Sequence, residues 1–77
     1  MINEELLEIL RYVYHANQGG MKPNYNKIRR EFSIAPGTVR NRIRELEEKE
    51  LVDIEKIGRS KVLEVTDKGR SLLLRKV

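Results

Sequence analysis

The chain has 77 residues, no cysteine, and a net charge of +4 from sixteen Lys and Arg against twelve Asp and Glu. A chain this short forms one domain, residues 1–77, with a thin core, because it buries only about 60% of its unfolded surface. The lack of cysteine excludes disulfides, thiolate metal sites and a thiol nucleophile. There is no run of 18 apolar residues and the first residues are acidic. We therefore expect a cytoplasmic protein without a membrane span or signal peptide.

The charges are arranged in blocks along the chain. Residues 22–44 carry seven Lys or Arg and one Glu, residues 45–55 carry six acids and one Lys, and residues 56–77 carry seven bases and two acids. Such charges often do no more than solvate a surface. Here the two basic blocks coincide with the helix and the hairpin described below, which favours a polyanionic partner.

The first predicted helix covers residues 3–17. Asn3 is its N-cap, and Glu4 and Glu5 lie in the first turn, where the helix dipole favours carboxylates. Its broad apolar face consists of Leu6, Leu7, Ile9, Leu10, Val13 and Tyr14. His15 is the only histidine, and without a second His or a Cys nearby we expect no metal or catalytic role for it.

A double glycine at positions 19 and 20 ends this helix, and a short loop leads to a second helix at about Tyr25–Phe32 with Asn24 as its cap. The side chains of Tyr25, Ile28 and Phe32 are three and four residues apart and are predicted to face inward. The basic residues of this helix remain outside or at its edge; they are Lys27, Arg29 and Arg30.

A turn at residues 33–35 leads to a third helix, roughly Pro36–Lys49. Proline suits the first turn of a helix, and Val39, Ile43 and Leu46 form one apolar stripe. The opposite side carries Gly37, Asn41, Arg44 and Glu48, flanked by Thr38 and Arg40. Arg and Asn side chains pair with guanine and adenine edges in the major groove of DNA. The carboxylates of Glu45, Glu47 and Glu48 would repel phosphate, so the second half of the helix is predicted to lean away from nucleic acid.

The segment from Val52 to Glu55 alternates apolar and charged residues, as does the segment from Leu63 to Thr66. This alternation indicates two half-buried strands joined by a turn around Gly58, and hence a β-hairpin. The basic residues at its tip are Lys56, Arg59 and Lys61. Such a tip either contacts the DNA backbone or minor groove, or is a solubilising turn.

The last predicted helix covers about Asp67–Lys76, with Thr66 and Asp67 at its capping end. Its apolar residues are Leu72, Leu73 and Val77, while Arg75 and Lys76 lie at the end where cations are favourable. The helix is short enough to pack on the first one, and the two together could form a dimer face.

Residues 36–49, PGTVRNRIRELEEK, resemble the P-x-T-V-x-x-x-I-x-x-L-E-x-K recognition helix of bacterial and archaeal winged-helix transcription regulators. Residues 63–70, LEVTDKGR, are similar to the L-T-x-K-G-R wing exit of MarR- and PadR-like regulators, and the loop with Pro23 is similar to that of LexA-type DNA-binding domains. The resemblance covers about residues 4–74. It implies an α+β, mostly α fold: a winged helix–turn–helix with a three-helix core, a two-stranded β-wing and a short C-terminal helix.

Three positions depart from the family pattern. Ala35 stands where a Ser or Thr cap is usual, at a cost of about 1 kcal/mol. Arg29 replaces the usual small residue in the middle of the second helix, so its side chain must extend outward. Glu50 replaces the usual glycine after the recognition helix, so either a left-handed cap is strained by about 1 kcal/mol or the helix ends differently.

The resemblance implies sequence-specific binding of double-stranded DNA by a small, nucleoid-associated transcription regulator. The residues expected to contact bases are Thr38, Arg40, Asn41 and Arg44. Those expected to contact the DNA backbone are Lys22, Lys27, Arg29, Arg30 and Arg42, with Arg59 and Lys61 from the wing. We expect a homodimer through the first and last helices, and no cofactor, metal, small-molecule ligand or membrane partner.

Three other functions are open. A protein-interaction module is the main alternative, because the acidic stretch Glu45–Glu55 could face a basic partner. Binding of RNA or single strands needs exposed aromatic side chains, and of the four present we expect Tyr25 and Phe32 to be buried. An enzyme is disfavoured because the sequence offers no nucleophile–base set and no cofactor loop.

Overall fold

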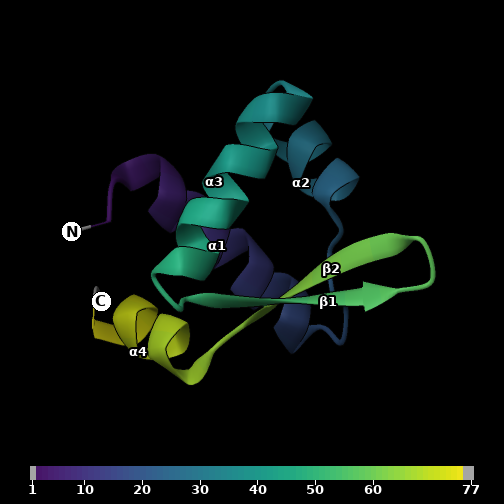
Figure 1. Ribbon diagram of the computed structural model, residues 1–77. Helices are drawn as coiled ribbons and strands as arrows, with labels where there is room; N and C mark the ends of the chain where they lie inside the picture. The colour runs from purple at the N-terminus through teal and green to yellow at the C-terminus, as the bar shows by residue number, and fades with distance from the viewer. Residues whose placement is uncertain (1, 76–77) are drawn as a thin grey trace.

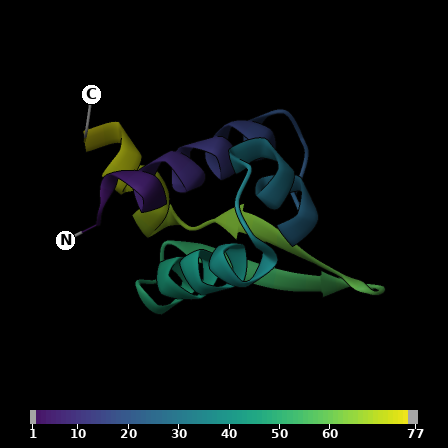
Figure 2. The same ribbon diagram turned by 90° about the horizontal axis from the view of Figure 1, so that it is seen from above.

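The computed structural model describes residues 2–75. Within them the chain forms α1 (Glu4–Gln18), α2 (Tyr25–Phe32), α3 (Pro36–Glu48), β1 (Val52–Ile57), β2 (Ser60–Val65) and α4 (Asp67–Arg75). The hairpin of β1 and β2 projects as a wing, and both chain ends lie at the opposite end of the molecule (Figures 1 and 2). This confirms the predicted winged helix–turn–helix. No helix of the described residues has the length and apolarity needed to cross a membrane.

The first two helices begin where their capping residues predict. The Asn3 side chain accepts a hydrogen bond from the backbone N–H of Leu6 at 2.8 Å. Asn24 does the same for Lys27, also at 2.8 Å. Each cap satisfies a backbone donor that has no partner inside the helix, so local sequence alone determines both starting points.

The core lies where α1, α3 and the hairpin meet. Figure 2 shows α3 and the hairpin on one side of α1. The fully buried side chains are Leu6, Ile9, Leu10, Val13, Ile28, Ile43, Leu46, Val52 and Leu63. They include two of the three residues in the predicted stripe of α3, Ile43 and Leu46, and the remaining one, Val39, is buried with 3% exposure. Burial of this stripe fixes which side of α3 faces outward.

The helix α3 lacks a side-chain cap at its start and ends in a strained turn. Ala35 offers no capping hydrogen bond, as its side chain predicts. At the other end Glu50 adopts a φ of 62°, the left-handed region that favours glycine. The N–H of Leu51 donates to the carbonyl of Leu46 at 3.0 Å, and that of Glu50 to Glu47 at 2.9 Å. This is a Schellman end without its usual glycine, and the helix stops one residue before the predicted Lys49.

The hairpin is longer than the alternating pattern indicated. The ladder pairs Val52 with Val65 at its base and Ile57 with Ser60 at its tip, so Lys56 and Lys61 face each other across the two strands. Only Gly58 and Arg59 remain in the turn. Gly58 has a φ of 60°, which suits the first position of a two-residue type II′ hairpin turn.

A third segment borders β2 on the edge away from β1. Asn24 forms an isolated bridge with Val62, and the N–H of Leu63 donates to the carbonyl of Pro23 at 2.9 Å. This pairing could not be predicted from the sequence, because a single bridged residue leaves no alternating pattern.

The helix α4 packs closely against the loop between α3 and β1. Gly69 is buried, and a Cβ there would meet the backbone carbonyl of Leu51 and lie 2.9 Å from Cγ1 of Val65. The Thr66 hydroxyl accepts from the N–H of Gly69 at 3.0 Å and donates to the carbonyl of Glu50 at 2.7 Å. These contacts explain the glycine in the wing-exit motif. The predicted end of the helix at Lys76, and the apolar Val77, lie outside the described residues.

Candidate nucleic-acid interface

The outward side of α3 carries most of the residues predicted to contact bases. Arg40, Asn41 and Arg44 are exposed, while Thr38 is half-buried. Because Val39 and Ile43 point into the core, the 100° step of a helix directs Arg40 and Arg44 toward the wing and Asn41 straight outward. The structure thus brings the two arginines toward the hairpin and leaves Asn41 and Thr38 outside that contact.

A hollow of about 380 Å³ lies between α3 and the wing. It is lined by Tyr25, Arg40, Arg44, Glu47, Ile54, Lys56 and Lys61. We call it the cationic groove, after the four bases Arg40, Arg44, Lys56 and Lys61. The four cations of α3 and the wing face a single carboxylate, that of Glu47, and together they make a surface suited to a polyanion.

The cationic groove continues toward the tip of the wing. A second hollow of about 250 Å³ is lined by Asn24, Tyr25, Asn26, Arg59, Ser60 and Lys61. It shares Tyr25 and Lys61 with the first. The start of α2 forms one side of this hollow, and the positive end of its dipole adds to the attraction for anions. The two hollows together connect α3 to the wing tip.

Tyr25 lies at the junction of the two hollows, where the sequence predicted a buried side chain. It is only partly buried and packs against the edge of the core. Burial is the main cause that raises the pKa of its hydroxyl above the ordinary 10.0, and Glu47 adds to this while Arg40 and Arg44 oppose it. The hydroxyl therefore stays protonated at neutral pH and can donate a hydrogen bond into the cationic groove.

Two of the residues predicted to contact the DNA backbone are held by carboxylates. Nζ of Lys22 lies 2.9 Å from Glu55 and 3.9 Å from Glu64, both on the wing. The hydrogen bond that Lys22 donates to Glu55 is the main cause that raises the pKa of Lys22. Nε of Arg42 lies 2.6 Å from Glu5 on α1. For both side chains a contact with phosphate would compete with an existing partner.

The other residues predicted to contact the backbone are more accessible. Lys27 and Arg30 are exposed on α2, and Arg59 and Lys61 are exposed on the wing. Arg29 is half-buried, as expected for a long side chain that extends outward from a helix crossing.

Tyr25 and Lys56 line the cationic groove but were not among the residues predicted to contact DNA. Lys56 was noted at the hairpin tip but belongs to the ladder opposite Lys61, which directs it toward α3. Tyr25 was assigned to the core. Its position in the first turn after Asn24 was the available signal, because a tyrosine there can bury its ring and leave its hydroxyl in water.

The acidic side chains of α3 are not clustered into a metal site in the part of the chain that the structure describes. Among residues 2–75 no group of three or more His, Cys, Asp or Glu side chains lies close enough together to hold an ion. The carboxylates in the second half of α3 are spread around the helix: Glu47 lines the cationic groove, and Glu48 is exposed elsewhere.

A helix–turn–helix whose third helix shares a cationic groove with a β-hairpin defines a winged-helix domain of the kind found in transcription regulators. Residues 20–75 match the family described as the DUF6293 C-terminal winged helix domain, and the chain belongs to that family. No curated protein matches the chain.

Solved structures share the winged-helix fold of this chain. The protein AF1382 of Archaeoglobus fulgidus is 29% identical with a TM-score of 0.86, over 99% of this chain and 84% of that one. MepR, a transcription regulator of the Staphylococcus aureus multidrug efflux pump MepA, is 28% identical with a TM-score of 0.88, over 96% of this chain and 54% of its own. The chain therefore spans about half the length of MepR. The structure of a MepR–DNA complex matches with 28% identity and a TM-score of 0.84, over 96% of this chain and 53% of that one.

Proposed function

We propose that this domain binds double-stranded DNA and acts in a transcription regulator, with α3 in the major groove and the wing on the adjacent backbone or minor groove. The cationic groove carries the proposal. In B-DNA a strand of phosphates separates the major groove from the neighbouring minor groove. If α3 enters the major groove and the wing touches the neighbouring minor groove, this strand of phosphates must pass between α3 and the wing. Arg40, Arg44, Lys56 and Lys61 line this passage.

Affinity and specificity would come from different residues. Contacts to phosphate by the wing, Lys27 and Arg30 would supply affinity that does not depend on sequence. Arg40 and Arg44 could pair with guanine, and Asn41 with adenine. Thr38, half-buried at the start of α3, would reach only a base close to the helix end. The structure of a MepR–DNA complex, from a protein of the same fold with 28% identity, supports binding to DNA.

We further propose that the domain works as a homodimer through α1 and α4. Leu74 on α4 is 56% exposed. A nearby hollow of about 260 Å³ is lined by Ile2, Lys49, Leu51, Lys68, Leu72 and Arg75. Exposed apolar surface of this kind often marks a contact between proteins. Sedimentation velocity tests the dimer, and selection of bound duplexes from a random pool should return a palindrome if it binds as one.

The first experiment is a fluorescence anisotropy titration on a duplex obtained by that selection, at several salt concentrations. Log affinity should fall linearly with log salt, and Arg59→Ala, which removes a wing contact to phosphate, should reduce the slope by about one. Arg11→Ala is the matched control, because it removes one exposed arginine from α1, outside the cationic groove. Its slope should equal that of the wild type. Absence of binding to any duplex at low salt would favour the protein-interaction alternative.

Specificity has its own test. Asn41→Ala should weaken binding to the selected duplex by about 1–3 kcal/mol and binding to random duplex by much less. Equal losses on both duplexes would mean that Asn41 contacts only the backbone.

A further inference from the structure

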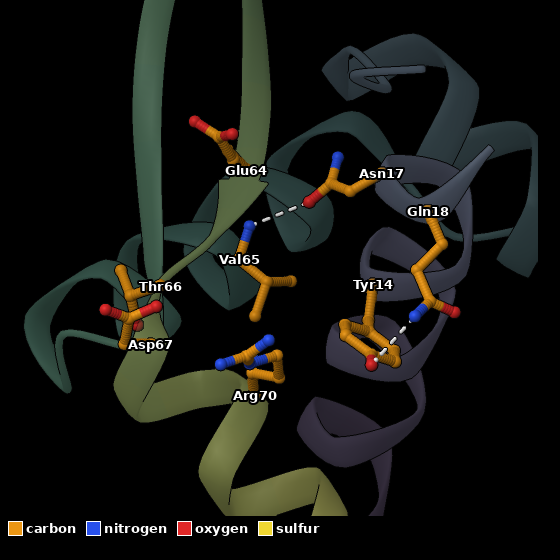
Figure 3. Close-up of a pocket in the computed structure, with 8 residues that line it drawn as sticks. All are labelled: Tyr14, Asn17, Gln18, Glu64, Val65, Thr66, Asp67 and Arg70. Atoms are coloured by element: carbon orange, nitrogen blue, oxygen red, sulfur yellow. Dashed lines mark hydrogen bonds between the residues drawn. The ribbon is translucent and has the colours of Figure 1, made fainter. Parts of the chain in front are cut away.

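One amide side chain, that of Asn17, joins the wing to α1. Oδ1 of Asn17 accepts a hydrogen bond from the N–H of Val65 at 2.8 Å, a bond drawn in Figure 3. Nδ2 donates to the carbonyl of Leu63 at 3.3 Å and to that of Met21 at 2.9 Å. Asn17 thus takes the place that a neighbouring strand would have on this edge of β2, and it ties α1, the following loop and the wing together.

The surface next to Asn17 is hollowed. Beside Asn17 lies a hollow of about 270 Å³, lined by Tyr14, Asn17, Gln18, Glu64, Val65, Thr66, Asp67 and Arg70 (Figure 3). The side chains of Tyr14 and Gln18 bond to each other at 2.9 Å rather than to the strand. Asn17 is therefore the side chain of α1 that hydrogen-bonds to β2 here, beside the packing of Val65 against the core.

The outer part of the wing has no apolar anchor. Every residue from Glu55 to Lys61 is exposed. The ion pair of Lys22 with Glu55 joins two exposed side chains and contributes little. The direction of the wing is therefore set at its base, by the burial of Val62 and Leu63, by the bonds of these two residues to Pro23 and Asn24, and by Asn17.

A small rotation at the base has a large effect at the tip. The six steps along the chain from Val65 to Arg59 span about 20 Å at roughly 3.3 Å per residue, so a tilt of about 10° moves the tip by roughly 3.5 Å. That distance exceeds the length of a hydrogen bond. A tilted wing would carry Arg59 and Lys61 off a phosphate strand that Arg40 and Arg44 still hold.

We infer that Asn17 is a positioning residue, which holds the wing at the angle where its cations and those of α3 face the same DNA. This inference rests on the proposed function, and Asn17 itself touches no DNA in it. Removal of its amide should leave the wing folded as a hairpin but change its orientation relative to α1.

The test on DNA is a double-mutant cycle between Asn17→Ala and Arg59→Ala. If Asn17 positions the wing, Asn17→Ala should reduce the salt slope of DNA binding by about as much as Arg59→Ala, by one or more. The double variant should bind little more weakly than either single variant, because both remove the same contact. If the two losses of DNA affinity multiply in the double variant, or if Asn17→Ala leaves the salt slope unchanged, Asn17 has only a structural role.

Asn3→Ala is the matched control. It removes one side-chain acceptor from a backbone N–H at the other end of α1, with a similar cost in stability and no contact with the wing. It should leave the salt slope unchanged. If Asn17→Ala does not fold, Asn17→Asp is used in the same cycle, since it keeps the acceptor for Val65 and loses both donors.

A second measurement needs no DNA. Residual dipolar couplings of the amides of residues 56–61, compared with those of α1, report the orientation of the wing in the free protein. We expect a rotation of the wing in Asn17→Ala and none in Asn3→Ala. An unrotated wing would overturn the inference even if DNA binding is confirmed, and failure of the wild type to bind DNA would contradict the proposed function alone.

Discussion

Arg42 on α3 pairs with Glu5 on α1, with 2.6 Å between Nε of the guanidinium and Oε1 of the carboxylate. The pair joins the proposed recognition helix to the helix on which it packs. It also occupies a guanidinium that the sequence assigned to phosphate contact.

Arg42→Ala should therefore lower the free energy of unfolding slightly and leave DNA binding almost unchanged. The pair is partly exposed, so we expect a loss of at most about 1 kcal/mol. Glu5→Gln removes the other partner and should cost a similar amount. Urea unfolding measures both. A fall of about one in the salt slope of Arg42→Ala would instead support the phosphate contact predicted from the sequence.

The strained end of α3 offers a stabilising substitution. Glu50 has a φ of 62°, and glycine adopts that conformation without strain. Glu50→Gly should raise the free energy of unfolding by about 1 kcal/mol, which corresponds to roughly 4–8 °C in Tm for a domain of this size. The same change two residues earlier, Glu48→Gly, lies in the helix and should destabilise by up to about 1 kcal/mol. Thermal unfolding by circular dichroism compares them. A lower Tm for Glu50→Gly would mean that its side chain stabilises the turn.

Two glycines make a second matched pair. Gly69→Ala places a methyl group against the carbonyl of Leu51 and should destabilise by about 1–3 kcal/mol or more. Gly37, in the first turn of α3, has open space around the position of a Cβ. Gly37→Ala should stabilise by about 0.4–1 kcal/mol, because alanine lowers the entropy of the unfolded chain. Similar Tm shifts for the two variants would contradict the close packing of α4 against the loop between α3 and β1.

Stability should fall at alkaline pH. Burial raises the pKa of Tyr25 and of Tyr12 above the ordinary 10.0, so the folded state keeps these protons longer than the unfolded state. Their contribution is complete below pH 10 and is lost as the pH rises through the folded pKa. Tyr25→Phe should flatten the decline in urea midpoint above pH 10. An identical decline in the variant would mean that Tyr25 ionises as freely in the folded state as in the unfolded one.

Most of the fold follows from local patterns. Asn3 and Asn24 cap their helices where the sequence places them, and Val39, Ile43 and Leu46 become the buried stripe of α3. These features depend on residues three or four apart, so a single stretch of sequence contains all the information needed. The strained left-handed residue at Glu50 was one of two outcomes left open by the missing glycine, and it is the one observed.

The features that the sequence did not predict depend on residues that are far apart along the chain. Asn17 bonds to Val65, 48 residues away, and Arg42 pairs with Glu5, 37 residues away. A pattern within one helix carries no signal for such partners. Tyr25 was assigned to the core for a related reason: its spacing is that of a core residue, and only the position of α3 and the wing shows that its hydroxyl borders a groove. The two basic blocks of the sequence predicted positive surface on the third helix and on the hairpin. That these surfaces form the two walls of one groove could not be predicted from them.

The central claim is that DNA occupies the cationic groove between α3 and the wing. The most direct test is a titration of isotope-labelled protein with a short random duplex at low salt, followed by amide chemical shifts. We predict the largest shifts at residues 37–44 and 56–61, and none on the outer side of α1 at Glu8, Arg11 and His15, which lies outside the cationic groove. Shifts confined to that side of α1, or no shifts at any residue, would contradict the claim.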